Sequence, residues 1–142
     1  MKKIKNILFI DDDDITCFIN RSIIEELQIS EGITCLDDEQ QALNYLKEKC
    51  GDKGAGVDAC PAIIFLDLNM PFFNAFEILE QLEEEPAVDR ENLFIVLLTS
   101  SLHTRDREKA KSYNVQGYLN KPLNPDKVID VVKRFHQRYP HL

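Results

Sequence analysis

Four short apolar runs, each followed by polar residues, constrain the fold of this chain more than any other feature. They span residues 7–10, 33–36, 63–66 and 94–98, and a shorter fifth run spans 118–120. Continuous apolar runs of this length are typical of strands that are buried on both faces of a parallel sheet. Residues with helical spacing follow each run, so the order strand-helix repeats five times. This alternation predicts an α/β fold with a doubly wound parallel sheet.

The predicted helices differ in how much apolar surface they carry. After the first run, apolar residues recur at spacings of three and four, which is typical of a helix packed against a core. These residues are Ile15, Phe18, Ile19, Ile23 and Leu27. The segment 103–113 is mostly charged, and it predicts a surface helix with little anchoring to the core.

The size and charge of the chain limit what it can be. Its 142 residues, 44% hydrophobic and 30% charged, suit one domain over residues 1–142 with a core of about residues 5–137. A net charge of −8 repels phosphate backbones, so we expect no nucleic-acid partner. The apolar runs are far shorter than the ~20 residues of a membrane span, and the N-terminal run is too short for a signal peptide. We therefore expect no membrane partner and a cytoplasmic location.

The four cysteines give no sign of a metal centre. Cys17, Cys35, Cys50 and Cys60 form no CxxC pair and no cluster with the three histidines, which argues against zinc. Cys17 and Cys35 lie among apolar residues and are interpreted as small core residues. Cys50 and Cys60 flank a loop and could come close, but in a reducing cytoplasm we expect free thiols.

Polar side chains stand where four of the predicted strands end. Residues 11–14 are four aspartates after the first run, Asp67 follows the third, Thr99 the fourth and Lys121 the fifth. The carboxyl ends of parallel strands meet at one edge, so these groups should converge. Clustered carboxylates need a cation, and Asp11, Asp12 and Asp67 can build a Mg²⁺ site. An aspartate can also act as a nucleophile toward phosphorus, with a lysine and a hydroxyl opposite to it.

Each of these residues also has an ordinary structural interpretation. Asp13 or Asp14 is a typical helix cap, Asp67 a strand-end turn residue, Thr99 a cap and Lys121 part of a loop. Taken together at four strand ends, the residues instead favour phosphoryl transfer onto a carboxylate.

Four ordered motifs resemble those of the receiver domain of two-component response regulators, the family of the stand-alone chemotaxis receiver. The motifs are Ile10-Asp11-Asp12-Asp13, Leu66-Asp67-Leu68-Asn69-Met70-Pro71, Leu98-Thr99-Ser100 and Gly117-Tyr118-Leu119-Asn120-Lys121-Pro122. They cover nearly the whole chain in the family's order. The resemblance implies a flavodoxin-like sheet with strand order 2-1-3-4-5 and five helices.

The resemblance also implies a role for each matching acidic residue. Asp67 matches the aspartate that accepts the phosphoryl group. Asp11 and Asp12 match the acidic pair that holds Mg²⁺ together with Asp67, and Asn69 matches the residue that offers a backbone carbonyl to the metal.

Further matches concern the switch and the lifetime of the phosphoryl group. Thr99 and Lys121 match the hydroxyl and the lysine that contact it, and Tyr118 matches the aromatic residue that moves inward with the hydroxyl. A tyrosine packed on the surface of an edge strand is the alternative interpretation of Tyr118. By the same resemblance, the residues that tune the lifetime are Asn69, Ser100 and Ser101.

One departure from the family pattern lies in the turn after Met70-Pro71. The family usually has glycine there, and this chain has Ala75. If the position needs a positive φ, alanine costs about 1 kcal/mol. Either the turn is reshaped or Asn74 takes the strained angle.

The resemblance implies a histidine kinase or histidine phosphotransfer protein as donor, and a monomer or weak homodimer. We expect no output domain within these residues, and therefore a readout through protein contacts.

The alternative is an aspartyl-phosphate-type phosphatase, since Asp11 and Asp13 have the spacing of its two acids; the motif at Asp67 would then have no role. A flavin or nucleotide module would need a Gly-rich loop after the first run. A calcium loop from Asp11 fails at Thr16 and Ser22.

Overall fold

The structure, a computed structural model, describes residues 2–50, 60–70, 74–86, 88, 90–100 and 104–140. Five parallel strands form one sheet in the order β2-β1-β3-β4-β5, as predicted. The strands are β1 (Ile7–Ile10), β2 (Ile33–Leu36), β3 (Ile63–Asp67), β4 (Phe94–Thr99) and β5 (Gly117–Asn120). The helices are α1 (Asp14–Leu27), α2 (Glu39–Cys50), α3 (Ala75–Glu84), α4 (Thr104–Lys111) and α5 (Pro125–Arg138), with a 3₁₀ turn η1 (Arg90–Asn92) before β4.

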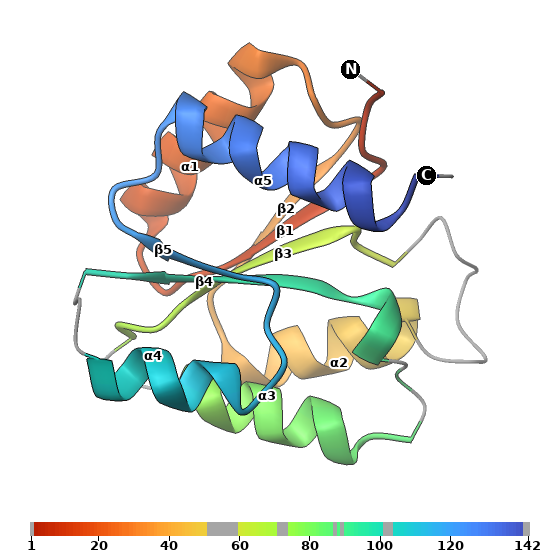
Figure 1. Cartoon of the computed structure of the whole chain (residues 1–142), viewed down its shortest axis with the longest axis vertical. Helices are drawn as coiled ribbons and strands as arrows, with labels where there is room; N and C mark the ends of the chain where they lie inside the picture. The colour runs from red at the N-terminus through yellow and green to blue at the C-terminus, as the bar shows by residue number, and fades with distance from the viewer. Residues whose placement is uncertain are drawn as a thin grey trace.

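The helices form a layer on each face of the sheet. Helices α1 and α5 lie on one face, and α2, α3 and α4 lie on the other (Figure 1). Alternate side chains of β1 point to opposite layers: Ile7 and Phe9 join the core under α1 and α5, whereas Leu8 and Ile10 join the core under α2 and α3. Both faces of the central strands are therefore buried, which explains the continuous apolar runs.

Helix α1 packs with a different face from the predicted one. Its buried side chains are Cys17, Asn20 and Ile24, and Ile23 and Leu27 are only partly buried against the core. The other predicted core residues, Ile15, Phe18 and Ile19, are 72%, 70% and 52% exposed. The prediction was wrong for these three because apolar residues occupy two faces of α1, and only one of them can meet the sheet.

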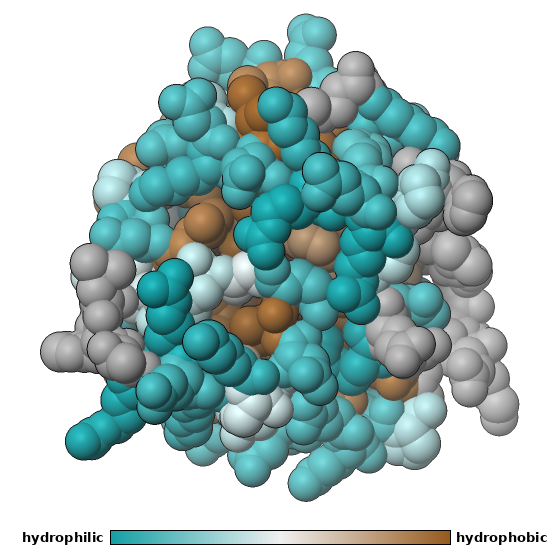
Figure 2. Space-filling view, in the orientation of Figure 1, coloured by the Kyte–Doolittle hydropathy of each residue, from teal (hydrophilic) through white to brown (hydrophobic). Residues whose placement is uncertain are grey.

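Helix α4 has little anchoring, as predicted from its charged sequence. Among the side chains of this helix that the structure describes, Ala110 alone is buried. The face of the molecule that includes α4 and α5 is mainly hydrophilic (Figure 2).

The expectation of four free thiols was wrong for one pair. Cys50, the last residue of α2, forms a disulfide with Cys60, and the two Cα atoms are 4.7 Å apart. The end of α2 lies beside the segment that enters β3, which brings the two side chains within the normal disulfide range. Cys17 and Cys35 are not disulfide-bonded, and Cys17 is buried as predicted.

Asn74 does not take the strained angle, and the rest of the turn, residues 71–73, lies outside the described residues. Asn74 has an extended backbone (φ −106°), and its side chain accepts a hydrogen bond from the backbone N–H of Phe76, so it caps α3. Ala75 is the first helical residue and is fully buried. Neither residue therefore needs the positive φ that would favour glycine. In the described part of the chain, no helix has the length and apolar character needed to cross a membrane.

Candidate functional site

The register of the sheet brings the predicted site residues to one edge. Ile10 of β1 pairs with Leu66 of β3, so the residues that follow them, Asp11 and Asp67, come from neighbouring strand ends. Thr99, the last residue of β4, pairs with Asn120 of β5. Lys121 follows Asn120, and its backbone N–H donates to the carbonyl of Thr99 (2.7 Å). The sheet alone thus positions four of the predicted groups.

Three of the predicted carboxylates form a cluster. One oxygen each from Asp11, Asp12 and Asp67 lies within 4.8 Å of the other two. Asp11 and Asp67 are buried, with exposed fractions of 4% and 3%, and Asp12 is half-buried. Three like charges this close together and this poorly hydrated are unfavourable unless a cation or a proton joins them.

The electrostatics of the cluster favour protonation in the absence of a cation. Burial raises the pKa of Asp11 from 3.8 to about 6, and the neighbouring Asp67 adds to this rise. Burial and the charge of Asp67 also raise the pKa of Asp12. The pKa of Asp13 is lowered, mainly by the hydrogen bond from the Thr16 hydroxyl. The pKa of Asp13 is thus shifted in the opposite direction to the pKa values of Asp11 and Asp12.

The cluster fits a hard divalent cation such as Mg²⁺. Asp11 Oδ1 accepts the backbone N–H of Asp13 (2.9 Å), whereas Asp11 Oδ2 is buried and has no hydrogen-bond partner among the described residues. A buried carboxylate oxygen without a donor is costly, and coordination to a cation would satisfy it. Carboxylate oxygens are also the ligands that Mg²⁺ prefers.

The side chain of Lys121 faces the cluster. Lys121 Nζ lies 2.8 Å from Asp67 Oδ1, and the lysine side chain is 23% exposed. The Lys121–Pro122 peptide bond is cis. Lys127 supports the same loop, because its Nζ donates to the carbonyls of Asn120 (2.7 Å) and Pro122 (2.9 Å). The ammonium group of Lys121 is thus held beside Oδ1 of Asp67 by a loop that Lys127 of α5 fixes in place.

Asn69 connects the two loops that flank the cluster. Its backbone N–H donates to Asp67 Oδ1 (2.9 Å). Its side-chain Oδ1 accepts from the backbone N–H of Ser100 (2.6 Å) and from the Ser100 hydroxyl (3.1 Å). Both side chains are exposed, so they stand at the entrance to the site. Ser101, which was predicted with them, lies outside the described residues.

The two remaining predicted residues lie on β4 and β5. Thr99 is fully buried at the end of β4. Tyr118 of β5 is half-buried, and its hydroxyl is buried without a hydrogen-bond partner in the described part of the chain. The guanidinium of Arg107, on α4, lies 5.6 Å from the centre of the Tyr118 ring. Tyr118 therefore contacts both α4 and the core, which a purely surface tyrosine would not.

Asp13 has the structural role that its ordinary interpretation gave it. Its side chain caps α1 by accepting from the backbone N–H of Ile15 (3.0 Å) and from the Thr16 hydroxyl (2.8 Å). Sequence reasoning missed the supporting residues Thr16 and Lys127. A threonine three residues after a cap is a local signal that could have identified the first; the second depends on how α5 packs and has no local signal.

Comparison with known proteins gives one consistent result. Residues 7–133 match the family model described as "Response regulator receiver domain". A crystal structure of a two-component response regulator from Cytophaga hutchinsonii is 31% identical, with a TM-score of 0.84 over 96% of this chain and 99% of that chain.

Two curated relatives are similar over different shares of their length. The probable methanogenesis regulatory protein FilR2 of Methanothrix harundinacea (strain 6Ac) is 30% identical over 118 residues, which are 83% of this chain and 72% of FilR2. The nitrate/nitrite response regulator NarL of Escherichia coli (strain K12) is 38% identical over 77 residues. That match covers 54% of this chain but only 32% of NarL.

Proposed function

Since the chain belongs to the family of response regulator receiver domains of two-component systems, we propose that it accepts a phosphoryl group on Asp67 and thereby changes a surface that binds another protein. The observation that carries this proposal is the position of Asp67. It is buried beside two further carboxylates, and the amine of Lys121 lies 2.8 Å from its oxygen. The proposed donor is a histidine kinase or a histidine phosphotransfer protein in the cytoplasm.

The proposed chemistry is a phosphoryl transfer between two side chains. A carboxylate oxygen of Asp67 attacks phosphorus, the phosphorus–nitrogen bond of phosphohistidine breaks, and the imidazole leaves as the neutral base after taking up a proton from solvent. Mg²⁺, bound by Asp11, Asp12, Asp67 and the Asn69 carbonyl, would offset the negative charge of the phosphoryl oxygens. Lys121 would move from the Asp67 carboxylate to a phosphoryl oxygen, which keeps its charge paired.

The proposed switch uses the residues between the site and α4. Moving a population from 1:99 to 99:1 takes about 5.5 kcal/mol of preference for one state. Charge-assisted hydrogen bonds from Lys121 and from the Thr99 hydroxyl contribute about 1.5–3 kcal/mol each. Tyr118, which contacts α4 through Arg107, would transmit the movement of Thr99 to the surface. Asn69 and Ser100 stand at the entrance that attacking water would use. Together with Ser101, they would set the lifetime of the phosphoryl group.

The donor is proposed to dock on the exposed apolar side chains of α1, namely Ile15, Phe18 and Ile19. Helix α1 begins directly after the carboxylates of the cluster, so a protein that brings phosphohistidine to Asp67 must also cover the start of α1. In the described part of the chain these are the large hydrophobic side chains that are exposed. Covering them would add apolar burial to each encounter with the donor.

We expect Phe18→Ser to slow phosphoryl transfer from a phosphorylated histidine phosphotransfer protein by about tenfold, which corresponds to the loss of one buried aromatic contact. Labelling by acetyl phosphate should not change, because that donor has no protein surface. Phe18→Leu keeps an apolar contact and serves as the matched control. Equal slowing with both donors would contradict the docking role.

The proposal is tested by incubating the chain with acetyl phosphate and Mg²⁺ and measuring its intact mass. We expect a gain of one phosphoryl group per chain, reversed when Mg²⁺-dependent hydrolysis is allowed to proceed. The phosphatase alternative predicts turnover of a generic phosphate ester instead. Asp13 would be its second acid, but that side chain is held as the cap of α1. Absence of labelling together with ester turnover would replace the proposal with the alternative.

A further inference from the structure

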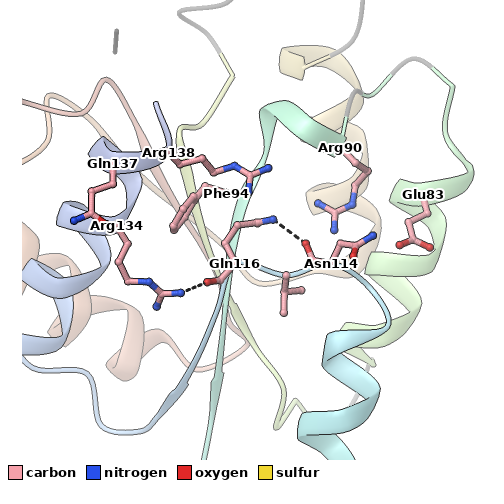
Figure 3. A pocket seen from close by; sticks show the side chains of 9 residues that line it. Glu83, Arg90, Phe94, Asn114, Gln116, Arg134, Gln137 and Arg138 are labelled. Atoms are coloured by element: carbon pink, nitrogen blue, oxygen red, sulfur yellow. Dashed lines mark hydrogen bonds between the residues drawn. The ribbon is translucent and has the colours of Figure 1, made fainter. Parts of the chain in front are cut away.

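A cavity of about 870 Å³ lies at the edge of the sheet opposite to Asp67. Phe94, the first residue of β4, and Gln116, which precedes β5, form its inner wall. The carboxylate cluster adjoins the other ends of these strands, roughly 15–20 Å away along β4. Figure 3 shows Arg134 and Arg138 of α5 on one side of this wall and Arg90 with Glu83 on the other. The cavity is thus a separate feature from the site described above.

The charge of the cavity is opposite to that of the chain. Its lining includes Arg90, Arg134 and Arg138 but a single carboxylate, Glu83, which is exposed. The chain as a whole carries a net charge of −8. Among the described residues, none of the three arginines takes part in an ion pair. Three guanidinium groups therefore share one hollow that a single carboxylate, Glu83, also lines, which leaves an excess of positive charge there.

Arg90 is the most constrained of the three. Its Nη2 donates to the carbonyl of Tyr113 (2.6 Å), which fixes the guanidinium in place. Its Nε and Nη1 are buried and have no hydrogen-bond partner among the described residues. Burial also lowers the pKa of Arg90, since the charge has lost part of its water. The charge of Glu83 acts on Arg90 in the opposite direction. A guanidinium that has lost part of its hydration and forms no ion pair among the described residues raises the electrostatic potential of the space beside it.

The rest of the cavity is held by hydrogen bonds. Gln116 accepts the backbone N–H of Ile95 at its Oε1 (2.7 Å) and donates from Nε2 to the carbonyl of Asn114 (2.7 Å). Arg134 donates to the carbonyl of Gln116, and Arg138 donates from Nε to the Tyr139 hydroxyl (3.0 Å). Among the described residues, each α5 arginine thus makes one hydrogen bond, and the guanidinium of Arg138 also lies over the Tyr139 ring (5.5 Å). A guanidinium has five N–H groups, so others remain to pair with a ligand.

We propose that this cavity binds a small multivalent oxyanion, that is, a molecule with two or more phosphate or carboxylate groups. Guanidinium groups pair with both classes through parallel N–H···O bonds. The volume lies within the range of small-molecule sites and exceeds what one monovalent anion fills. A ligand that bridges Arg90 with the α5 arginines would connect η1 and α5 across the start of β4.

The test is a titration of the ¹⁵N-labelled chain followed by NMR, in buffer freed of divalent metal with a chelating resin that is removed beforehand, so that no metal links the anion to the carboxylate cluster. Pyrophosphate and citrate represent the two ligand classes, and acetate at equal ionic strength is the monovalent control. We expect saturable shifts at the amides of Asn114, Val115 and Gln116 with at least one multivalent anion, and none with acetate. Which of the two binds identifies the class. No saturable shift at millimolar concentrations, or shifts only at Lys121, would overturn the proposal.

Variants separate binding from folding. Arg138→Gln and Arg134→Gln are each expected to lower the affinity for the anion by about tenfold, which is the effect of losing one charge-assisted contact. Arg105→Gln, an exposed arginine of α4, is the matched control and should leave affinity unchanged. Arg138→Lys keeps the charge and should retain part of the affinity. If both glutamine variants have the melting temperature and the anion affinity of the wild type, the cavity is not the binding site.

Discussion

Asp67→Asn is expected to reduce labelling by acetyl phosphate and Mg²⁺ by a factor of about 10³ or more, the size of loss typical when a covalent nucleophile is removed. An amide oxygen is a far weaker nucleophile than a carboxylate oxygen. The substitution keeps the size of the side chain and an acceptor for the backbone N–H of Asn69, so the loop after β3 should persist. Intact mass after a timed incubation measures the effect.

Asp13→Asn is the matched control for this experiment. It makes the same carboxylate-to-amide change at the rim of the site, and asparagine caps helices as well as aspartate does. Labelling should therefore stay close to that of the wild type. Labelling of Asp67→Asn at the wild-type rate would assign the phosphoryl group to another residue.

Asp11→Asn is expected to have opposite effects on stability with and without Mg²⁺. Without the metal, the variant should raise the free energy of unfolding by on the order of 2 kcal/mol near neutral pH, because it removes an ionised side chain that burial disfavours. The backbone N–H of Asp13 can still donate to the new amide oxygen. With Mg²⁺, the wild type should gain stability through binding and the variant should gain much less.

The pH dependence of this effect follows from the pKa of Asp11, which is raised in the folded chain from 3.8 to about 6. Below pH 3.8 the carboxyl is protonated in both the folded and the unfolded state, and the gain should vanish. Between pH 3.8 and about 6 the unfolded chain has lost this proton whereas the folded chain still holds it, so the stability of the wild type falls relative to the variant, and the difference is complete once the pH has passed 6. Urea unfolding in EDTA at several pH values measures this. A gain that persists at low pH would contradict the electrostatic cause.

The sequence was sufficient to predict that these side chains lie together, because parallel strands bring their carboxyl ends to one edge whatever the details of packing. Asp11, Asp67 and Lys121 needed only the strand order to become neighbours. The orientation of α1 was less accessible, since Ile15 and Ile24 belong to different faces of a helix that is apolar on both.

Features that depend on packing between distant segments gave no local pattern. The disulfide joins the end of α2 to the entrance of β3, and neither cysteine lies in a motif that predicts this contact. The arginine-lined cavity lies between η1 and the last two turns of α5, whose arginines look like ordinary surface residues in the sequence. Such sites become visible only when the layers are assembled.

The single buried contact of α4 has a consequence for how this fold can diversify. Since Ala110 is the one buried side chain in the described part of that helix, most other positions on it can mutate without opening a cavity in either core. Selection can therefore change the surface of this helix to suit a new binding partner while the acidic cluster and the sheet stay unaltered. Related proteins that share the same phosphoryl-accepting site would then differ in the proteins that bind them.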